Sequence, residues 1–196
     1  MTAAYKIQPI SDDEYLAGEL VSPVKHEYIS GMVYAMAGAG NQHNIIAGNA
    51  FAGLHAQLRG RRCRPFNSDT KIRIRLPTHV RYYYPDLSVV CRQNPSTDAF
   101  QDDPVVIVEV LSKSTRRLDM GEKRDAYLTL PSLLVYVLLE QDSAKAMVYR
   151  RTDRGFVNQE YSGLDSLIPL PEVESELLLA EVYDGVEFIP EPDEGE

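Results

Sequence analysis

The clearest pattern in the chain is an apolar stripe with helical spacing. Apolar side chains recur at every fourth position over residues 46–58, which predicts a helix with one buried face. Gly60 follows this segment and is expected to end the helix. The stripe consists of Ile46, Ala50, Leu54 and Leu58.

Two further helices are predicted from local signals. Ser11 and Glu14 have the spacing of a capping box, so a short helix should begin near residue 12. Another helix is expected over about residues 116–130, because Pro131 cannot continue it.

Strands are predicted where apolar residues alternate with polar ones or run together. Ser30-Gly31 is a turn signal inside a hairpin, and Pro85-Asp86 interrupts one strand. The run VVIVEVL is almost wholly apolar, as in a central strand buried on both faces. In chain order, the strands are predicted on both sides of residues 30–31 and over 70–76, 81–91, 105–111, 133–140 and 145–152.

This order of elements predicts an α/β protein with a central mixed sheet flanked by helices. Residues 105–140 form a strand–helix–strand unit, expected to be a right-handed parallel crossover. Residues 153–190 are less regular and suggest short strands with one helical turn. We expect one domain over residues 1–190 and a solvated acidic tail, EPDEGE, over residues 191–196.

Composition constrains the class of protein and the compartment in which it is found. The chain has 196 residues, of which 44% are hydrophobic, and its net charge is −9. It contains no apolar run of the roughly 20 residues that cross a bilayer and no apolar signal core at its start, so a cytoplasmic protein is expected. Cys63 and Cys91 fit a reducing compartment and form no zinc pattern.

The acidic total argues against nucleic acid, but the basic residues are clustered. Arginines gather over residues 59–64, and lysines and arginines follow the apolar strand over residues 113–124. Nucleic-acid binding is therefore not excluded. It should be weak, local, sensitive to salt and dependent on a metal ion that offsets the acids.

The candidate chemistry begins with two carboxylates on consecutive strands. Glu109 lies inside the apolar run, where a charge is costly unless it is paired or binds a metal. From position alone, an ion pair and a metal site are equally favoured for Glu109, because lysines and arginines follow closely in the sequence. Asp86, at the strand break, favours the metal, since two carboxylates on neighbouring strands can hold one Mg²⁺ (or Mn²⁺).

Three other side chains are candidates for the same site. Lys123 could swing back over the strand end and stabilise charge on phosphorus, although most such lysines lie on a solvated surface. Glu27 opens the hairpin. His43 lies near the start of the long helix and would favour an anion there, although simple capping by Asn41 explains that segment equally well.

Taken together, these segments resemble the Uma2 family of restriction-endonuclease-like proteins. The resemblance covers about residues 10–185, and its most specific part is EVLSKSTRRLD. The segments that carry it are HEYISGMVYAMAGAGNQH (26–43), PDLSVVC (85–91), PVVIVEVLSKSTRRLDMGEKRDAYLTL (104–130) and LLVYVLLEQDSAKAMVYRR (133–151).

The resemblance implies a restriction-endonuclease-like fold of the PD-(D/E)XK superfamily. It implies Asp86 and Glu109 as metal ligands, Glu27 and His43 at the rim of the same pocket, and Lys123 as the lysine. One departure is Leu111, which stands two residues after Glu109 where the superfamily has lysine. The lysine must then be Lys123 or, less favourably, Lys113. Homodimers fit this fold, whose nucleases often act as pairs on two strands.

Three functional hypotheses follow. The leading one is a Mg²⁺-dependent endonuclease that hydrolyses phosphodiester bonds of DNA. The second is a decayed nuclease scaffold that acts as a non-enzymatic interaction protein, which Leu111 favours. The third is a metal-dependent hydrolase of small phosphorylated molecules.

Overall fold

The computed structural model describes residues 8–188, and the acidic tail predicted at residues 191–196 lies outside them. The helices are α1 (Asp12–Glu19), α2 (Asn41–Leu58), α3 (Arg116–Leu118), η1 (Asp119–Lys123), α4 (Arg124–Tyr127), η2 (Pro171–Val173) and α5 (Leu179–Val182). The strands are β1 (His26–Ile29), β2 (Met32–Ala35), β3 (Arg64–Asn67), β4 (Lys71–Arg75), β5 (Val80–Tyr83), β6 (Leu87–Val90), β7 (Phe100–Gln101), β8 (Pro104–Leu111), β9 (Val135–Glu140), β10 (Lys145–Thr152), β11 (Gly155–Ser162), β12 (Leu167–Leu170) and β13 (Ser175–Leu178).

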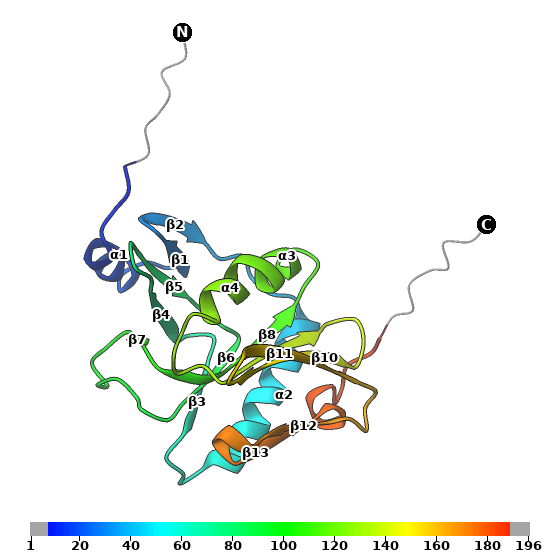
Figure 1. The fold of residues 1–196 in the computed structure, drawn as a ribbon. Coiled ribbons are helices and arrows are strands. Elements are labelled where there is room, and N and C mark those ends of the chain that lie inside the picture. The colour runs from blue at the N-terminus through cyan, green and yellow to red at the C-terminus, as the bar shows by residue number, and fades with distance from the viewer. Residues whose placement is uncertain (1–7, 189–196) are drawn as a thin grey trace, which may run out of the picture.

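The predicted α/β class with a mixed sheet flanked by helices is confirmed, and the structure adds a second sheet that the sequence did not show. The strands form a six-stranded mixed sheet in the order β11-β10-β9-β8-β6-β3, a five-stranded sheet β2-β1-β5-β4-β7, and the pair β12-β13 (Figure 1). The strand predicted over residues 81–91 is two strands, β5 and β6, in different sheets. Pro85-Asp86 is therefore a crossing between sheets rather than an interruption of one strand.

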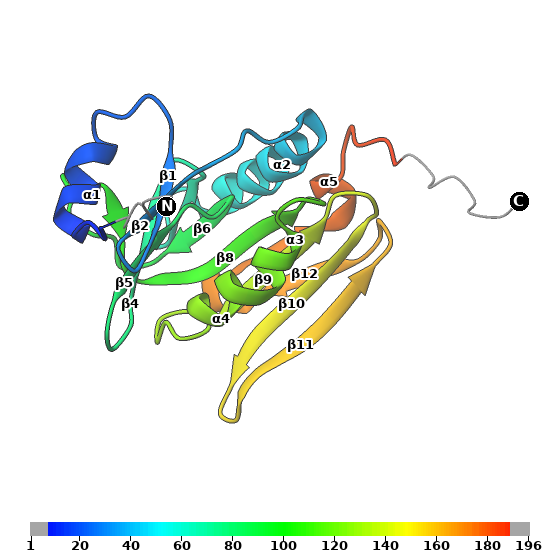
Figure 2. The same cartoon turned by 90° about the horizontal axis from the view of Figure 1, so that it is seen from above.

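Strand β8 is central, as its apolar sequence predicts. It pairs antiparallel with β6 and parallel with β9, so the strand–helix–strand unit is a parallel crossover. Its side chains alternate between two cores: Val106, Val108 and Val110 face α2, whereas Ile107 and Leu111 face α4. Figure 2 shows the long helix α2 on one side of β8 and the α3–α4 segment on the other.

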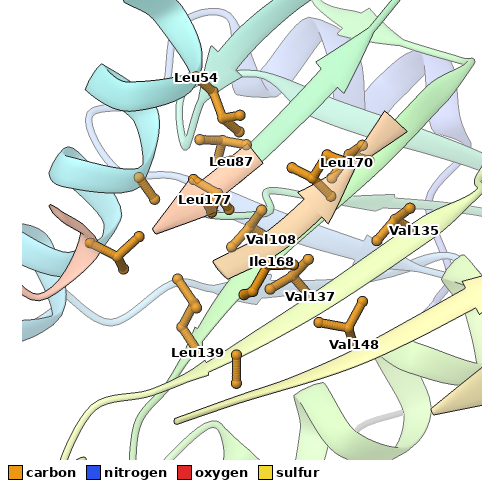
Figure 3. Close-up of a cluster of buried hydrophobic side chains, with 14 of the residues drawn as sticks. Leu54, Leu87, Val108, Val135, Val137, Leu139, Val148, Ile168, Leu170 and Leu177 are labelled. Carbon is orange, nitrogen blue, oxygen red and sulfur yellow. The ribbon is translucent and has the colours of Figure 1, made fainter. Parts of the chain in front are cut away.

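The core on the α2 side contains the predicted stripe. Ile46, Ala50, Leu54 and Leu58 are all buried and pack with β6, β8, β9 and the β12-β13 pair (Figure 3). The helix begins at Asn41 with Gly40 as its N-cap, so capping by Asn41 is wrong. Gly60, with φ of +75°, follows the helix end as predicted.

We expect Leu54→Ala to lower the free energy of unfolding by about 2–5 kcal/mol, because a fully buried leucine leaves a cavity when truncated. Ile45→Ala is the matched control, since Ile45 is on the same helix but 40% exposed. Urea titration measures both variants. Equal losses would contradict the assignment of α2 as the core helix of this face.

Several local predictions are confirmed and others need correction. The Ser11–Glu14 capping box and the Ser30-Gly31 turn are present, the latter with positive φ at both residues. Of the segment expected to be less regular, residues 153–188 are described, and they are more regular than expected, since β11 is eight residues long. Strand β4 carries a buried charge at Lys71, whose ammonium donates a hydrogen bond to the Tyr84 hydroxyl at 3.0 Å.

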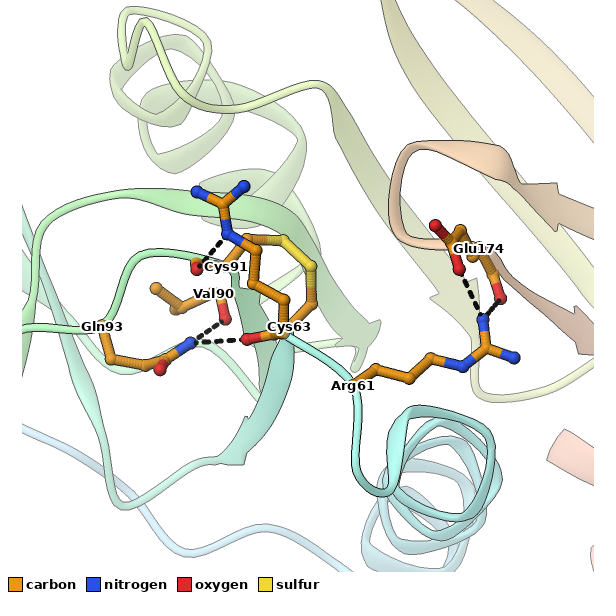
Figure 4. The surroundings of a disulfide bond; sticks show 7 residues. Arg61, Cys63, Val90, Cys91, Gln93 and Glu174 are labelled. Carbon is orange, nitrogen blue, oxygen red and sulfur yellow. Dashed lines mark hydrogen bonds and ion pairs between the residues drawn. A yellow bond between two sulfur atoms is a disulfide. The ribbon is translucent and has the colours of Figure 1, made fainter.

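The two cysteines form a disulfide between Cys63 and Cys91, which differs from the free thiols that fit a reducing compartment (Figure 4). Strands β3 and β6 pair antiparallel from Arg64 opposite Val90. Cys63 and Cys91 extend this register by one position, so their side chains meet at the end of the ladder. No helix among residues 8–188 is long and apolar enough to cross a membrane.

Candidate active site

All five candidate residues line one cavity of about 470 Å³. They come from four elements and one junction, so the fold rather than the chain order assembles them. Glu27 lies on β1, His43 on α2, Asp86 between β5 and β6, Glu109 on β8 and Lys123 on η1.

The two carboxylates predicted as metal ligands are neighbours. The backbone N–H of Asp86 donates to Glu109 Oε2 at 3.2 Å, and the N–H of Val110 donates to Asp86 Oδ2 at 2.7 Å. These reciprocal bonds join the sheet crossing at Pro85-Asp86 to the central strand. The crossing therefore fixes Asp86 beside Glu109, as the strand break in the sequence suggests.

Lys123 is the cation of the cavity. Its Nζ lies 2.8 Å from Glu27 Oε1, 3.6 Å from Asp119 Oδ1 and 3.9 Å from Glu109 Oε1. The side chain is only 7% exposed. Burial lowers the pKa of Lys123, but the charges of Glu109, Glu27 and Asp119 outweigh burial and raise that pKa above its ordinary value. The ammonium is therefore held charged among the acids.

Glu109 has an unfavourable setting for a charge. Burial raises its pKa well above the ordinary value, Lys123 opposes this, and the charges of Asp86, Asp119 and Glu27 raise it further. Its Oε1 accepts a hydrogen bond from the Tyr127 hydroxyl at 3.3 Å. A carboxylate so placed would be stabilised by an added cation.

Asp119 is a site residue that the sequence reasoning missed. It is 2% exposed, it lines the cavity, and burial is the main cause of its raised pKa. It stands four residues before Lys123, so both side chains share one helix face, and this spacing was visible in the sequence. Asp119 and Lys123 are the first and last residues of η1, a π-helical turn inside the helix predicted over residues 116–130. Such turns are frequent at functional sites.

His43 lies beside Asp86 in the cavity. Its Nε2 lies 3.2 Å from Asp86 Oδ2, while its Nδ1 is buried without a hydrogen-bond partner among the described residues. Burial lowers the pKa of His43, but the hydrogen bond and charge of Asp86 with the charge of Asp119 raise it overall. The N-cap Gly40 makes no side-chain cap hydrogen bond, and it lines the cavity together with His43.

Leu111, which stands two residues after Glu109, is a residue of the hydrophobic core. Leu111 is 3% exposed and packs in the cluster on the α4 side. Lys113 lines a neighbouring cavity of about 400 Å³ and not the cavity of the acids. Of the two lysines considered for the site, Lys123 is therefore the one beside the carboxylates.

The donor set fits a divalent cation bound by few protein ligands. Residues 8–188 contain no group of three or more His, Cys, Asp or Glu side chains arranged to hold a metal by themselves. Five carboxylates nevertheless line the cavity with one lysine and one histidine. Glu122 among them pairs with Arg81, and the other four leave an excess of negative charge. Mg²⁺ suits such a site, because it is commonly held by one or two carboxylates, with waters and substrate phosphate oxygens completing its shell.

Comparisons with known proteins identify the family of this chain. The Uma2 family model, described as "Putative restriction endonuclease", matches residues 12–180. Two proteins of Synechocystis are similar over most of their length. The protein slr1290 is 34% identical over 91% of this chain and 94% of its own, and sll1609 is 32% identical over 76% and 86%.

A solved structure shares the fold. The crystal structure of a "putative nuclease belonging to DUF820" from Anabaena variabilis superposes with a TM-score of 0.69. It covers 90% of this chain and 98% of that chain at 19% sequence identity. The predicted nuclease-like fold is therefore confirmed.

Proposed function

This chain belongs to the Uma2 family, and on that premise we propose that it is a Mg²⁺-dependent endonuclease that hydrolyses phosphodiester bonds of DNA. The observation that carries the proposal is the meeting of Asp86, Glu109 and Lys123 in one cavity, with Asp119 and Glu27 adding negative charge. This surplus of negative charge would favour a bound cation, and the cation could in turn bind a phosphate group.

The residues have separable roles in this proposal. Asp86 and Glu109 would hold Mg²⁺ (or Mn²⁺), each with an oxygen already oriented by a backbone N–H. A bound metal of this kind polarises a phosphoryl oxygen and acidifies water. Lys123 would stabilise charge that develops on the phosphate, because its ammonium is buried and fixed.

Glu27 and His43 would position rather than react. Glu27 Oε1 holds Lys123 at 2.8 Å and accepts from the Tyr84 N–H at 3.4 Å, so it fixes the ammonium from the side of the five-stranded sheet. His43 Nε2 lies 3.2 Å from Asp86 and orients that carboxylate. Each is then a supporting residue whose loss should reduce rather than abolish activity.

The direct test combines metal binding with cleavage. We expect calorimetry with Mg²⁺ or Mn²⁺ to give heat, the melting temperature to rise with either ion, and DNA to be cut only when the ion is present. Chelation by EDTA should stop cleavage. Absence of heat, thermal shift and cleavage with both ions would instead favour a non-enzymatic interaction protein on this scaffold.

A further inference from the structure

Beside Glu27, the lining of the cavity includes apolar side chains and an exposed tyrosine. Tyr34 lies on β2 directly across from Glu27 on β1, and paired residues of antiparallel strands project from the same face. Tyr34 therefore points to the side of the sheet that holds Glu27. Ile29 and Met36 line the cavity beside it.

Tyr34 differs from the other aromatic residues of the described chain. It is 50% exposed and is the only aromatic among the large apolar side chains exposed in residues 8–188. Tyr15, Tyr28, Tyr82, Tyr83 and Tyr127, in contrast, pack ring against ring. No aromatic or cationic partner covers the ring of Tyr34 within this part of the chain, so its face is free at the cavity.

The chain that follows Tyr34 leaves the mouth of the cavity open. Residues 37–40 are Ala-Gly-Ala-Gly, all exposed and all lining the cavity. They carry nothing larger than a methyl group, so a ligand can pass close to the backbone there. Strand β2 is also an edge strand, and no further strand in the described chain covers this side.

From this juxtaposition we infer that Tyr34 stacks on a base of an unpaired nucleotide whose phosphate lies at Asp86 and Glu109, so that the substrate is single-stranded at the point of cleavage. The inference rests on the proposed function and narrows its substrate. A cavity of about 470 Å³ suits one small ligand rather than a duplex. Stacking also needs a base with a free face, which single strands offer and paired duplexes do not.

The test measures binding separately from cleavage. Single-stranded and duplex oligonucleotides of one sequence are titrated with Mg²⁺ by fluorescence anisotropy, using the Lys123→Met protein, which keeps both proposed metal ligands and should form no product. In this background Tyr34→Ala should weaken single-strand binding by about tenfold or more. Tyr34→Phe should bind as the parent does, because phenylalanine keeps the ring.

Val33→Ala is the matched control, since Val33 is 40% exposed on the same strand but projects from the opposite face. It should leave binding unchanged. If Tyr34→Ala binds single strands as tightly as Val33→Ala does, or if duplex is bound more tightly than single strand, the inference is overturned. The proposed nuclease function is not affected by either result. If the wild type neither binds nor cuts either form with Mg²⁺, the proposed function itself fails.

Discussion

Glu109→Gln is expected to reduce Mg²⁺-dependent cleavage by more than about 100-fold. Even residues that only support metal ligands are worth about 10- to 100-fold in metalloenzymes, and Glu109 is proposed as a ligand itself. Glutamine keeps the shape of the side chain and an oxygen for the Tyr127 hydroxyl, but it lacks the charge that a cation needs. The change should therefore remove function without removing the fold.

The same substitution should change how stability depends on pH. Burial and the neighbouring acids place the pKa of Glu109 well above its ordinary value in the folded protein. A raised folded-state pKa means that folding is favoured by protonation. This contribution is full below the ordinary carboxyl pKa and is lost as pH rises through the folded-state value.

Metal-free wild-type protein should thus lose stability with rising pH more steeply than Glu109→Gln, by up to about 1.4 kcal/mol per pH unit. Urea unfolding in EDTA at several pH values measures this difference. Glu160→Gln is the control, because Glu160 is exposed on β11, away from the cavity. Parallel pH curves for wild type and Glu109→Gln, or full cleavage activity in the variant, would contradict the role of this carboxylate.

The sequence indicates which charged residues meet in the cavity, but it does not indicate how the strands divide between sheets. A lone carboxylate in an apolar strand is conspicuous, because burying a charge without a partner is costly. Glu109 could therefore be singled out from VVIVEVL alone, and Asp86 from the strand break before it. The structure brings both into one cavity with the three other candidates.

The division into two sheets could not be deduced in the same way. Apolar alternation shows that a segment is a strand but not which sheet it joins, so β5 and β6 resembled one interrupted strand. The disulfide could not be predicted for a similar reason. Cys63 and Cys91 are 28 residues apart, and only the β3-β6 register brings them together. Asp119 was missed because it lies in a polar segment, where nothing in the pattern marks a single acid as buried, although it stands four residues before Lys123.

Lys123→Met is expected to lower the stability of the metal-free protein by about 3–5 kcal/mol. The ammonium is within 4.0 Å of Glu27, Asp119 and Glu109, and all four side chains are less than a tenth exposed. Removing one partner of a buried ion pair leaves uncompensated charge, which is the costly case. Methionine keeps most of the volume, so the loss reports charge rather than packing.

A divalent cation should partly replace the missing charge. Mg²⁺ is therefore expected to raise the melting temperature of Lys123→Met more than that of the wild type, although the variant should no longer cleave DNA. Lys113→Met is the matched control, because Lys113 is exposed and lines the neighbouring cavity. Equal melting temperatures for the two variants, with and without Mg²⁺, would show that Lys123 does not balance the acids. A cleaving Lys123→Met would show that the proposed hydrolysis does not need its ammonium.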